Sequence, residues 1–349
     1  MARKLKRSKS GINILIIYTG GTIGMVQDHK TGELKPINFN QIKEEVPESR
    51  KFNYNIDVVS FNPVLDSSDM QPMHWVQMAE IIQKNYEDYT GFVILHGSDT
   101  LAYTASALSF MLENLSKPVI ITGSQLPVGE IRTDAKENLI TSIEIAATLI
   151  DGKPAVPEVC VYFDYLLFRG NRVTKMNSSK FEAFQSVNFP PLAEVGVHLK
   201  FNTHLILKVT GKKLKVHKNL DPSIGLIRLF PGMSRDWFTA QLRAKNIKAL
   251  IIETFGSGNA PSAGWFIDEL NLALSTGLVV VNITQCAGGT VEQGRYTTSS
   301  KLAKMGVVAG ADLTSEAAIS KLMCLLGRKL KMAEIKRLMK VSMAGELTA

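Results

Sequence analysis

The chain has 349 residues, of which 45% are apolar and 21% charged, so its composition is that of a soluble globular protein with room for two domains. No apolar run approaches the roughly 18 residues of a membrane-spanning helix, which argues against a transmembrane segment. The net charge of +8 suggests nucleic acid as a possible partner. Much of the excess positive charge lies in the first nine residues, however, and aromatic and basic residues do not interleave as they do in single-strand binding proteins. We therefore expect neither a nucleic acid nor a membrane as a partner.

The basic start, followed by a short apolar run, has two features of a signal peptide. No small-x-small cleavage site follows, however, and cleavage there would remove the first predicted strand. Cys160, Cys286 and Cys324 show neither C-x-x-C nor metal-ligand spacing, which predicts reduced thiols rather than disulfides. We therefore expect a cytoplasmic protein.

The first predicted element is a strand over residues 14–18, apolar and rich in β-branched residues like a strand buried in a parallel sheet. Gly20 and Gly21 follow it and permit a turn that presents Thr22 at the end of the strand. Because ligands of open α/β sheets bind beyond the carboxyl ends of the strands, Thr22 is a candidate nucleophile. The glycine spacing does not fit the G-x-G-x-x-G dinucleotide fingerprint, which disfavours nucleotide binding.

The pattern of a buried strand followed by small polar residues then recurs along the chain. A polar stretch from Met25 to Asn55 is a candidate lid. Short βαβ connections are as a rule right-handed, so the carboxyl ends of the strands are expected along one edge of the sheet. Strands are predicted over residues 56–61, 92–96, 119–122 and 158–163, and the polar clusters near their ends are 66–69, 97–100, 123–125 and 169–175.

A basic segment near residues 206–223 interrupts this pattern, and a second series of alternating strands and helices follows it. The segment is interpreted as a linker between two α/β domains. The expected organisation is a basic disordered head (1–11), an N-terminal catalytic α/β domain (12–205), the linker (206–223) and a C-terminal α/β domain (224–349).

The predicted crevice offers hydroxyls and carboxylates but few histidines. Only His96 and His74 fall near it, so a Ser-His-Asp triad and a metal site are both poorly supported. The remaining arrangement is a hydroxyl nucleophile that is activated through Lys175, with an aspartate that holds the lysine. A neutral lysine must lose about three pKa units, a cost of roughly 4 kcal/mol that burial has to supply. The alternatives are that Lys175 is an ordinary exposed charge and that Asp99 is a helix N-cap.

Several of these clusters resemble the motifs of one enzyme family. Residues 19–24, read as TGGTIG, and residues 96–104, read as HGSDTLAYT, resemble the paired signature of the bacterial-type L-asparaginase family. The similarity runs from about Asn13 to Ala349 and is strongest to the cytosolic type I branch. Further matching segments are Asp66 to Met70, Ile121 to Gln125, Arg169 to Lys175, Gly258 to Pro261 and Gly345 to Thr348.

The resemblance implies hydrolysis of L-asparagine to L-aspartate and ammonia through an acyl-enzyme. Thr22 matches the family's nucleophile, and backbone N–H groups near Gly21 and Ser98 are candidates for the oxyanion hole. The second hydroxyl, the carboxylate and the lysine of the family match Ser98, Asp99 and Lys175. The substrate-binding positions match Asp66, Ser67, Ser68, Ser98 and Asp99.

The resemblance also implies a larger N-terminal domain with a mostly parallel sheet and a smaller, flavodoxin-like C-terminal α/β domain. No cofactor is implied, and the expected assembly is a homodimer or a homotetramer. The rival functions are a glutamine-amidase subunit of a tRNA-dependent amidotransferase and a non-catalytic amino-acid sensor. The preference for asparagine or glutamine is left open, because one methylene is worth only about 1 to 3 kcal/mol.

The chain departs from the family pattern at three places. Ser98 stands where a threonine is usual, and Glu253 stands where some type I members use an arginine for allosteric binding of asparagine, which puts such activation in doubt. Many members carry a tyrosine on the loop after the first strand, but this chain has none between Met25 and Asn53. The hypothesis is that Tyr296 or an ordered water replaces it.

Overall fold

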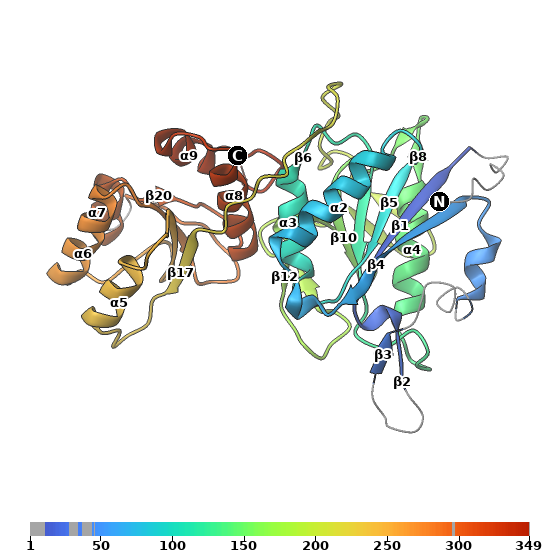
Figure 1. The fold of residues 1–349 in the computed structure, drawn as a ribbon, viewed down its shortest axis with the longest axis horizontal. Helices are drawn as coiled ribbons and strands as arrows, with labels where there is room; N and C mark the ends of the chain where they lie inside the picture. Colours follow the sequence, from blue (N-terminus) through green and yellow to red (C-terminus); the bar gives the residue numbers. More distant parts are fainter. Residues whose placement is uncertain (1–10, 28–33, 37–43, 45, 295–296, 349) are drawn as a thin grey trace. The chain divides into compact units, whose positions relative to one another are not determined.

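The computed structural model describes residues 11–27, 34–36, 44, 46–294 and 297–348, and the chain divides into two compact units (Figure 1). The first unit comprises residues 1–186 and 190–216, and the second comprises residues 187–189 and 217–349. Each unit contains a parallel or mainly parallel sheet with helices, which confirms the predicted α/β class. Residues 206–216, placed in the linker by the sequence, belong to the first unit, where β16 (Lys215–Val216) pairs with β6 (Leu112–Glu113).

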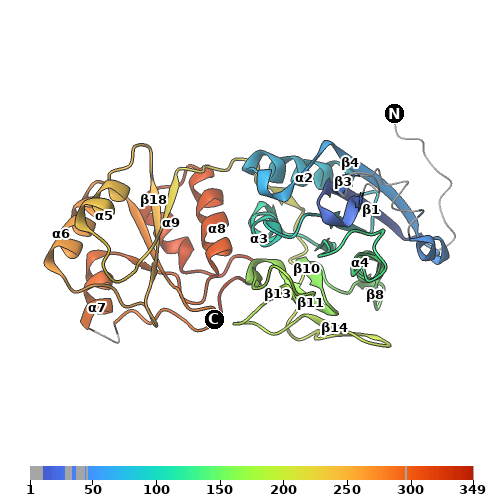
Figure 2. The same cartoon turned by 90° about the horizontal axis from the view of Figure 1, so that it is seen from below.

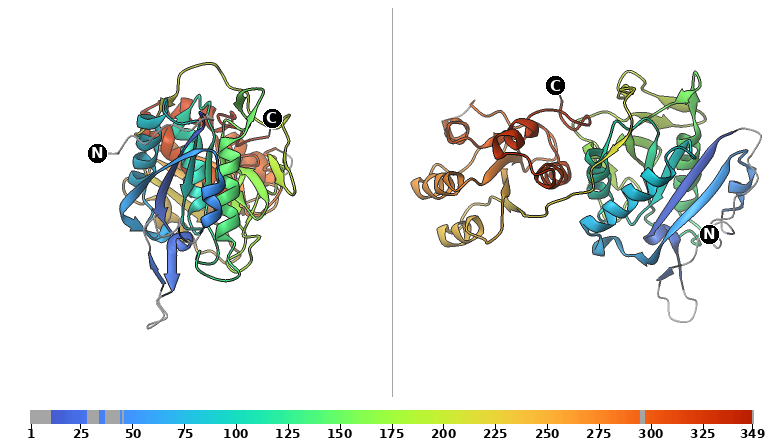
Figure 3. Two further views of the ribbon diagram at one scale, coloured as in Figure 1. Left: turned by 90° about the vertical axis from the view of Figure 1, so that its right-hand side faces the viewer. Right: turned by 45° about the horizontal axis from the view of Figure 1, so that its top comes forward.

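The main sheet of the first unit has eight strands in the order β15-β14-β11-β10-β7-β5-β1-β4. Its parallel part consists of apolar strands, and every residue of β5, β7 and β10 is buried, as expected of strands covered on both faces. Strands β1 and β4 run side by side at one edge (Figure 3). The parallel strands are β1 (Asn13–Gly20), β4 (Asn55–Leu65), β5 (Gly91–Leu95), β7 (Val119–Thr122) and β10 (Val159–Phe163). The antiparallel strands are β11 (Leu166–Arg169), β14 (Ala193–Val195) and β15 (Leu199–Phe201).

Helices lie on both faces of this sheet (Figure 2). They are α2 (Pro72–Asn85), α3 (Leu101–Met111) and α4 (Ala135–Ala147). Adjacent residues of β5 point to opposite faces: Phe92 stacks on Tyr86 at the end of α2, whereas Gly91 leaves no room for a side chain beside the Ala146 carbonyl of α4. Helix α3 packs beside α2, so α3 and α4 lie on opposite faces.

The position of α4 changes the handedness of one connection. The connections β5-α3-β7 and β7-α4-β10 step in the same direction across the sheet, but they pass over opposite faces, so they have opposite hands. The expectation that all βαβ units are right-handed is therefore wrong for one of them. The carboxyl ends of the parallel strands still share one edge of the sheet, because strand direction does not depend on the hand of the connection.

Shorter elements complete the first unit. Residues 28–33 and 37–43 of the candidate lid, and residues 1–10 of the basic head, lie outside the described residues. The short strands are β2 (Met25–Gln27), β3 (Leu34–Pro36), β8 (Leu149–Ile150), β9 (Lys153–Pro154), β12 (Thr174–Lys175) and β13 (Phe184–Gln185). The 3-10 helices are η1 (Thr22–Gly24), η2 (Pro47–Lys51), η3 (Ser67–Asp69) and η4 (Gly170–Arg172).

The second unit has a four-stranded parallel sheet in the order β17-β18-β19-β20. Alternate residues of β18 enter two different cores: Ile251 packs with α8 and α9, and Ile252 packs with α5 and α6. The strands are β17 (Ile224–Arg228), β18 (Ala249–Thr254), β19 (Val279–Thr284) and β20 (Val308–Ala309). The helices are α5 (Arg235–Leu242), α6 (Gly264–Ser275), α7 (Thr297–Met305), α8 (Ser315–Gly327) and α9 (Met332–Met339). None of the helices within the described ranges combines the length and the hydropathy needed to cross a membrane.

Candidate active site

Thr22 lies where the sequence predicts it, at the start of η1, directly after β1. The turn depends on Gly21, which has a φ of 88° and approaches the backbone of Gly97 so closely that a Cβ atom there would collide with it. Gly97 in turn leaves no space for a side chain beside the Ser67 hydroxyl. The loops that follow β1, β4 and β5 are therefore in direct contact, and the half-buried Thr22 lies among them.

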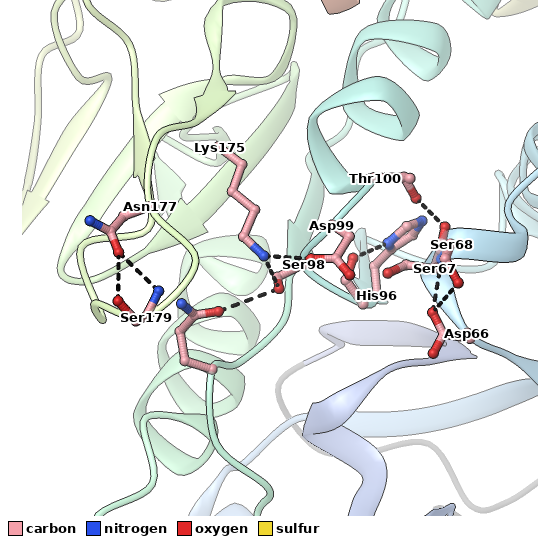
Figure 4. Close-up of polar contacts among 12 residues, drawn as sticks. Asp66, Ser67, Ser68, His96, Ser98, Asp99, Thr100, Lys175, Asn177 and Ser179 are labelled. Atoms are coloured by element: carbon pink, nitrogen blue, oxygen red, sulfur yellow. Dashed lines mark hydrogen bonds and ion pairs between the residues drawn. The ribbon is translucent and has the colours of Figure 1, made fainter.

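Lys175 contacts both of its predicted partners (Figure 4). Its Nζ lies 2.8 Å from the Ser98 Oγ and 2.7 Å from the Asp99 Oδ1. The lysine side chain is only 17% exposed, so the alternative that it is an ordinary exposed charge is wrong. Asp99 is 66% exposed, which leaves most of its carboxylate open to solvent or to a ligand.

Asp99 is not the N-cap of α3. The N-cap residue is Thr100, whose hydroxyl donates to the Ser67 carbonyl at 2.7 Å and so joins the loops after β4 and β5. That cap carries no side-chain hydrogen bond to the first turn of the helix. The Asp99 carboxylate is therefore committed to Lys175 and not to the helix.

Asp66 accepts two hydrogen bonds from one neighbour, as Figure 4 shows. The Ser68 backbone N–H donates to its Oδ1 at 2.8 Å, and the Ser68 hydroxyl donates to the same atom at 2.9 Å. These bonds, the backbone one first, lower the pKa of Asp66, so its carboxylate stays charged well below neutral pH. An exposed, charged carboxylate beside Thr22's turn is a suitable partner for a substrate ammonium group.

The two histidines near the site are structural. His96 is fully buried and its Nδ1 lies 2.7 Å from the Gly97 carbonyl oxygen; because a carbonyl only accepts, Nδ1 carries the proton. Its Nε2 then accepts from the Thr104 hydroxyl at 2.8 Å. Burial lowers the pKa of His96 to about 4, so the ring is neutral at physiological pH and holds the loop after β5 in place. His74 accepts from the Gln71 backbone N–H at the start of α2.

Gln125 is a site residue to which the sequence gives no role. The Ser98 hydroxyl faces the Gln125 Oε1 at 3.4 Å, and the Gln125 Nε2 donates to the Lys180 carbonyl at 2.8 Å. Because that carbonyl only accepts, the amide must present its oxygen to Ser98. The lysine ammonium therefore donates to the Ser98 oxygen, and the hydrogen of Ser98 points to Gln125. The sequence signals for Gln125 are its position in a polar cluster after a strand and in a segment that resembles the family, Ile121 to Gln125.

Asp134 supports the same loop. The sequence predicts it as a cap of α4, and it is the N-cap residue, but its side chain does not cap the helix. Its carboxylate accepts instead from the backbone N–H groups of Gln125 at 2.9 Å and of Leu126 at 3.1 Å. The carboxylate therefore fixes the loop after β7 on which Gln125 stands.

Two further expectations concern a tyrosine and a metal. Tyr296, the candidate second catalytic hydroxyl, lies outside the described residues, so its place relative to Thr22 stays a prediction. Within the described ranges, no group of three or more histidine, cysteine, aspartate or glutamate side chains has the geometry to hold a metal ion.

Comparisons with known proteins find relatives over almost the whole chain. The family model "Asparaginase, N-terminal" matches residues 13–207, and the model "Glutaminase/Asparaginase C-terminal domain" matches residues 223–339. L-asparaginase 1 of Escherichia coli K12 is 44% identical over 342 residues, covering 96% of this chain and 98% of that one. One subunit of the glutamyl-tRNA(Gln) amidotransferase of Pyrococcus abyssi is 34% identical over 351 residues, covering 99% of this chain and 79% of that one. The crystal structure of L-asparaginase I from Vibrio cholerae has a TM-score of 0.88 and 39% identity and covers 99% of this chain and 100% of that one.

Proposed function

The chain belongs to the asparaginase family, and on that premise we propose that it hydrolyses L-asparagine to L-aspartate and ammonia through an acyl-enzyme on Thr22. Two observations support the proposal: Lys175 contacts Ser98 and Asp99, and the turn that carries Thr22 touches the loop of Ser98 and Asp99 through Gly21 and Gly97. A hydroxyl nucleophile beside a lysine with a carboxylate partner is a known arrangement for acyl transfer.

Substrate binding assigns separate tasks to the charged groups. Asp66, with its lowered pKa, pairs with the α-ammonium group of asparagine, and the exposed part of Asp99 assists it. The Ser67 hydroxyl follows Asp66 in the chain and donates to the α-carboxylate, whereas the Ser68 hydroxyl donates to Asp66 and keeps that carboxylate in place for the ammonium group. These contacts hold the side-chain amide over Thr22, which converts the attack into an intramolecular step.

The reaction then has two halves. In the first, the Thr22 oxygen attacks the amide carbon, its proton passes to the departing nitrogen, and ammonia leaves an ester on Thr22. Backbone N–H groups near Gly21 and Ser98 stabilise the negative oxygen that forms at the carbonyl. In the second half, water attacks the ester, the Lys175 ammonium gives a proton to the Thr22 oxygen as the ester bond breaks, and Lys175 recovers a proton from the attacking water through the Ser98 hydroxyl, so that aspartate leaves and both groups return to their starting state. The net reaction consumes one water and needs no other reactant.

The protein's surroundings are proposals as well. We infer a homodimer or homotetramer from the family resemblance alone. We also infer a cytoplasmic location, which suits the free thiols of Cys160, Cys286 and Cys324.

The test is the ammonia released by the purified chain from L-asparagine and, separately, from L-glutamine, with Thr22→Ala as the control. We expect turnover of asparagine that disappears in the variant. A folded wild-type protein that turns over neither amide would contradict a hydrolase that acts alone. Ammonia released only with tRNA and a partner protein would favour the amidotransferase subunit, and binding without turnover would favour the sensor.

A further inference from the structure

Tyr18 lies in β1, shortly before Thr22, and its side chain reaches forward to the nucleophile's turn. The residue is 1% exposed and is among the largest fully buried side chains of the described structure. Its hydroxyl donates a hydrogen bond to the Gly24 carbonyl at 3.0 Å. In the sequence pattern Tyr18 is only one more residue of an apolar strand, so its hydroxyl has no assigned role.

The contact between Tyr18 and the turn is close on several atoms. A Cβ atom on Gly24 would collide with the hydroxyl and the ring of Tyr18, so the tyrosine occupies the space that any side chain there would need. The turn is closed by a hydrogen bond from the Gly24 N–H to the Gly21 carbonyl at 3.1 Å. Thr22 therefore lies in a short turn that is held at both ends. Gly97 contacts the first residue of the turn, Gly21, and Tyr18 contacts its last residue, Gly24.

The hydroxyl of Tyr18 is unsuited to carry a proton during the reaction. Its hydrogen is committed to a carbonyl, and burial raises the pKa of Tyr18 to about 12, so the phenol stays neutral at physiological pH. Tyr18 can therefore affect the reaction only by fixing the position of the turn that carries Thr22.

We propose that Tyr18 is a positioning residue that holds the turn, and with it the Thr22 hydroxyl, in the orientation for attack on the substrate. The inference rests on the proposed role of Thr22 as the nucleophile. Without the phenolic hydroxyl the Gly24 carbonyl loses its donor, and the turn gains freedom while the substrate-binding loops after β4 and β5 keep their own contacts. The expected effect is on kcat and not on KM.

The chain offers a matched control in Tyr162. This tyrosine lies in β10 of the same sheet, is fully buried, and donates its hydroxyl hydrogen to the Glu137 carboxylate at 2.6 Å, so Tyr162→Phe also deletes one hydrogen bond of a buried tyrosine, here a partly buried bond. We expect Tyr18→Phe to lower kcat for asparagine by roughly tenfold to a hundredfold with KM within about twofold, since small misplacements of reacting groups have effects of this size. Tyr162→Phe lowers Tm but leaves kcat near the wild-type value. Wild-type kcat in Tyr18→Phe, or an equal loss in both variants, would overturn the proposal.

A second pair of variants serves if Tyr18→Phe does not fold. Gly24→Ala disturbs the same contact from the side of the turn, whereas Gly196→Ala adds a methyl group where nothing lies within 4 Å. We expect a large loss of kcat in Gly24→Ala alone. Equal kcat in these two variants would also overturn the proposal.

Labelling of Thr22 separates this inference from the proposed function. The diazoketone analogue of L-asparagine alkylates an activated hydroxyl, and mass spectrometry gives the site and rate of labelling without any turnover. We expect Tyr18→Phe to slow the labelling of Thr22 by about the same factor as kcat. If wild-type protein releases no ammonia but Thr22 is labelled, more slowly in Tyr18→Phe, the hydrolase fails and the positioning role stands. If Thr22 is not labelled in wild-type protein, both fall.

Discussion

Lys175 lies far along the chain from the residues that it contacts, since 77 positions separate it from Ser98. Nothing in the local pattern of residues 174–175 distinguishes this lysine from a solvated one; the polar cluster after a predicted strand makes it a candidate, and the resemblance to a family gives it its role. Its 17% exposure and its two short contacts are consequences of the fold, which brings β12 back to the end of β5. The chemistry of the site therefore depends on a contact that the sequence pattern alone does not contain.

Replacement of this lysine tests its role directly. Lys175→Met keeps the length of the side chain but removes the ammonium group between Ser98 and Asp99, so we expect kcat to fall by about 10² to 10⁴, the range for a lost proton-transfer group. Lys180→Met is the control, because Lys180 is exposed and only its backbone carbonyl takes part in the site. Steady-state kinetics with asparagine measures both variants. Similar kcat values in the two would show that Lys175 has no catalytic part.

The pH dependence of substrate binding belongs to Asp66. Its pKa is lowered in the folded protein, so the charged form that binds an ammonium group is present above that pKa and is lost as the pH falls through it. Ser68→Ala removes the hydroxyl that donates at 2.9 Å but keeps the backbone bond, so the pKa of Asp66 rises part of the way back. We expect the acidic limb of kcat/KM to move to higher pH in Ser68→Ala.

A serine elsewhere in the unit provides the comparison for this shift. The Ser109 hydroxyl donates to the Ala105 carbonyl within α3, so Ser109→Ala removes a similar bond without touching Asp66. Rate profiles between about pH 3 and 8 compare the three proteins, a range that brackets the ordinary carboxylate pKa. An acidic limb that stays in place in Ser68→Ala would assign that limb to another group.

At the scale of the elements, the strands that hold the site are the easiest to predict. β5, β7 and β10 are apolar along their whole length because both faces are covered, and such runs stand out in a sequence. The antiparallel strands β11, β14 and β15 escape prediction, because strands of three or four residues contain too few positions to establish an alternation. The prediction of a right-handed connection through α4 is also wrong. The hand of a connection depends on which face of the sheet its helix packs against, and the sequence pattern does not contain that information.

The C-terminal segment is fixed to α8 by a fully buried ion pair. The Lys321 Nζ lies 2.6 Å from the Glu346 Oε1 and donates to the Val341 carbonyl at 2.8 Å, and both side chains are 0% exposed. Glu346 also accepts from the backbone N–H groups of Met343 and Ala344. Burial lowers the pKa of Lys321, and the Glu346 charge offsets part of that shift. The pair therefore closes the loop after α9 onto the core of the second unit.

Breaking this pair from one side should be costly. Lys321→Met leaves the Glu346 carboxylate buried without its cation, and we expect a loss of about 3 to 5 kcal/mol in the free energy of unfolding, as for other buried pairs. The double variant Lys321→Met/Glu346→Leu removes both charges and should recover part of the loss. Urea unfolding of the wild type, Lys321→Met, Glu346→Leu and the double variant gives the coupling energy. A loss in Lys321→Met below about 1 kcal/mol, the range of surface pairs, would contradict the expectation.

At the scale of the whole molecule, the question is whether the second unit regulates the first. Glu253 stands at the carboxyl end of β18, where some members of the type I branch carry an arginine for a second asparagine. Its carboxylate accepts from the Ser315 hydroxyl at 2.5 Å and lies 3.5 Å from the Arg228 guanidinium, and the residue is 7% exposed. A buried carboxylate at this place repels the α-carboxylate of an amino acid, whereas an arginine would attract it.

We therefore expect initial rates that depend hyperbolically on asparagine concentration, with a Hill coefficient of about 1, since identical active sites that do not influence one another give no cooperativity. Glu253→Gln keeps the shape of the side chain and removes its charge, so it separates repulsion from shape. If only the charge of Glu253 prevents asparagine from binding a second site, Glu253→Gln should show sigmoidal rates at high asparagine. If the chain has no second site at all, the rate curve of Glu253→Gln stays hyperbolic. A Hill coefficient clearly above 1 in the wild-type protein would mean that asparagine binds a second site in spite of Glu253, and the Glu253→Gln curve would then show whether that site includes this carboxylate.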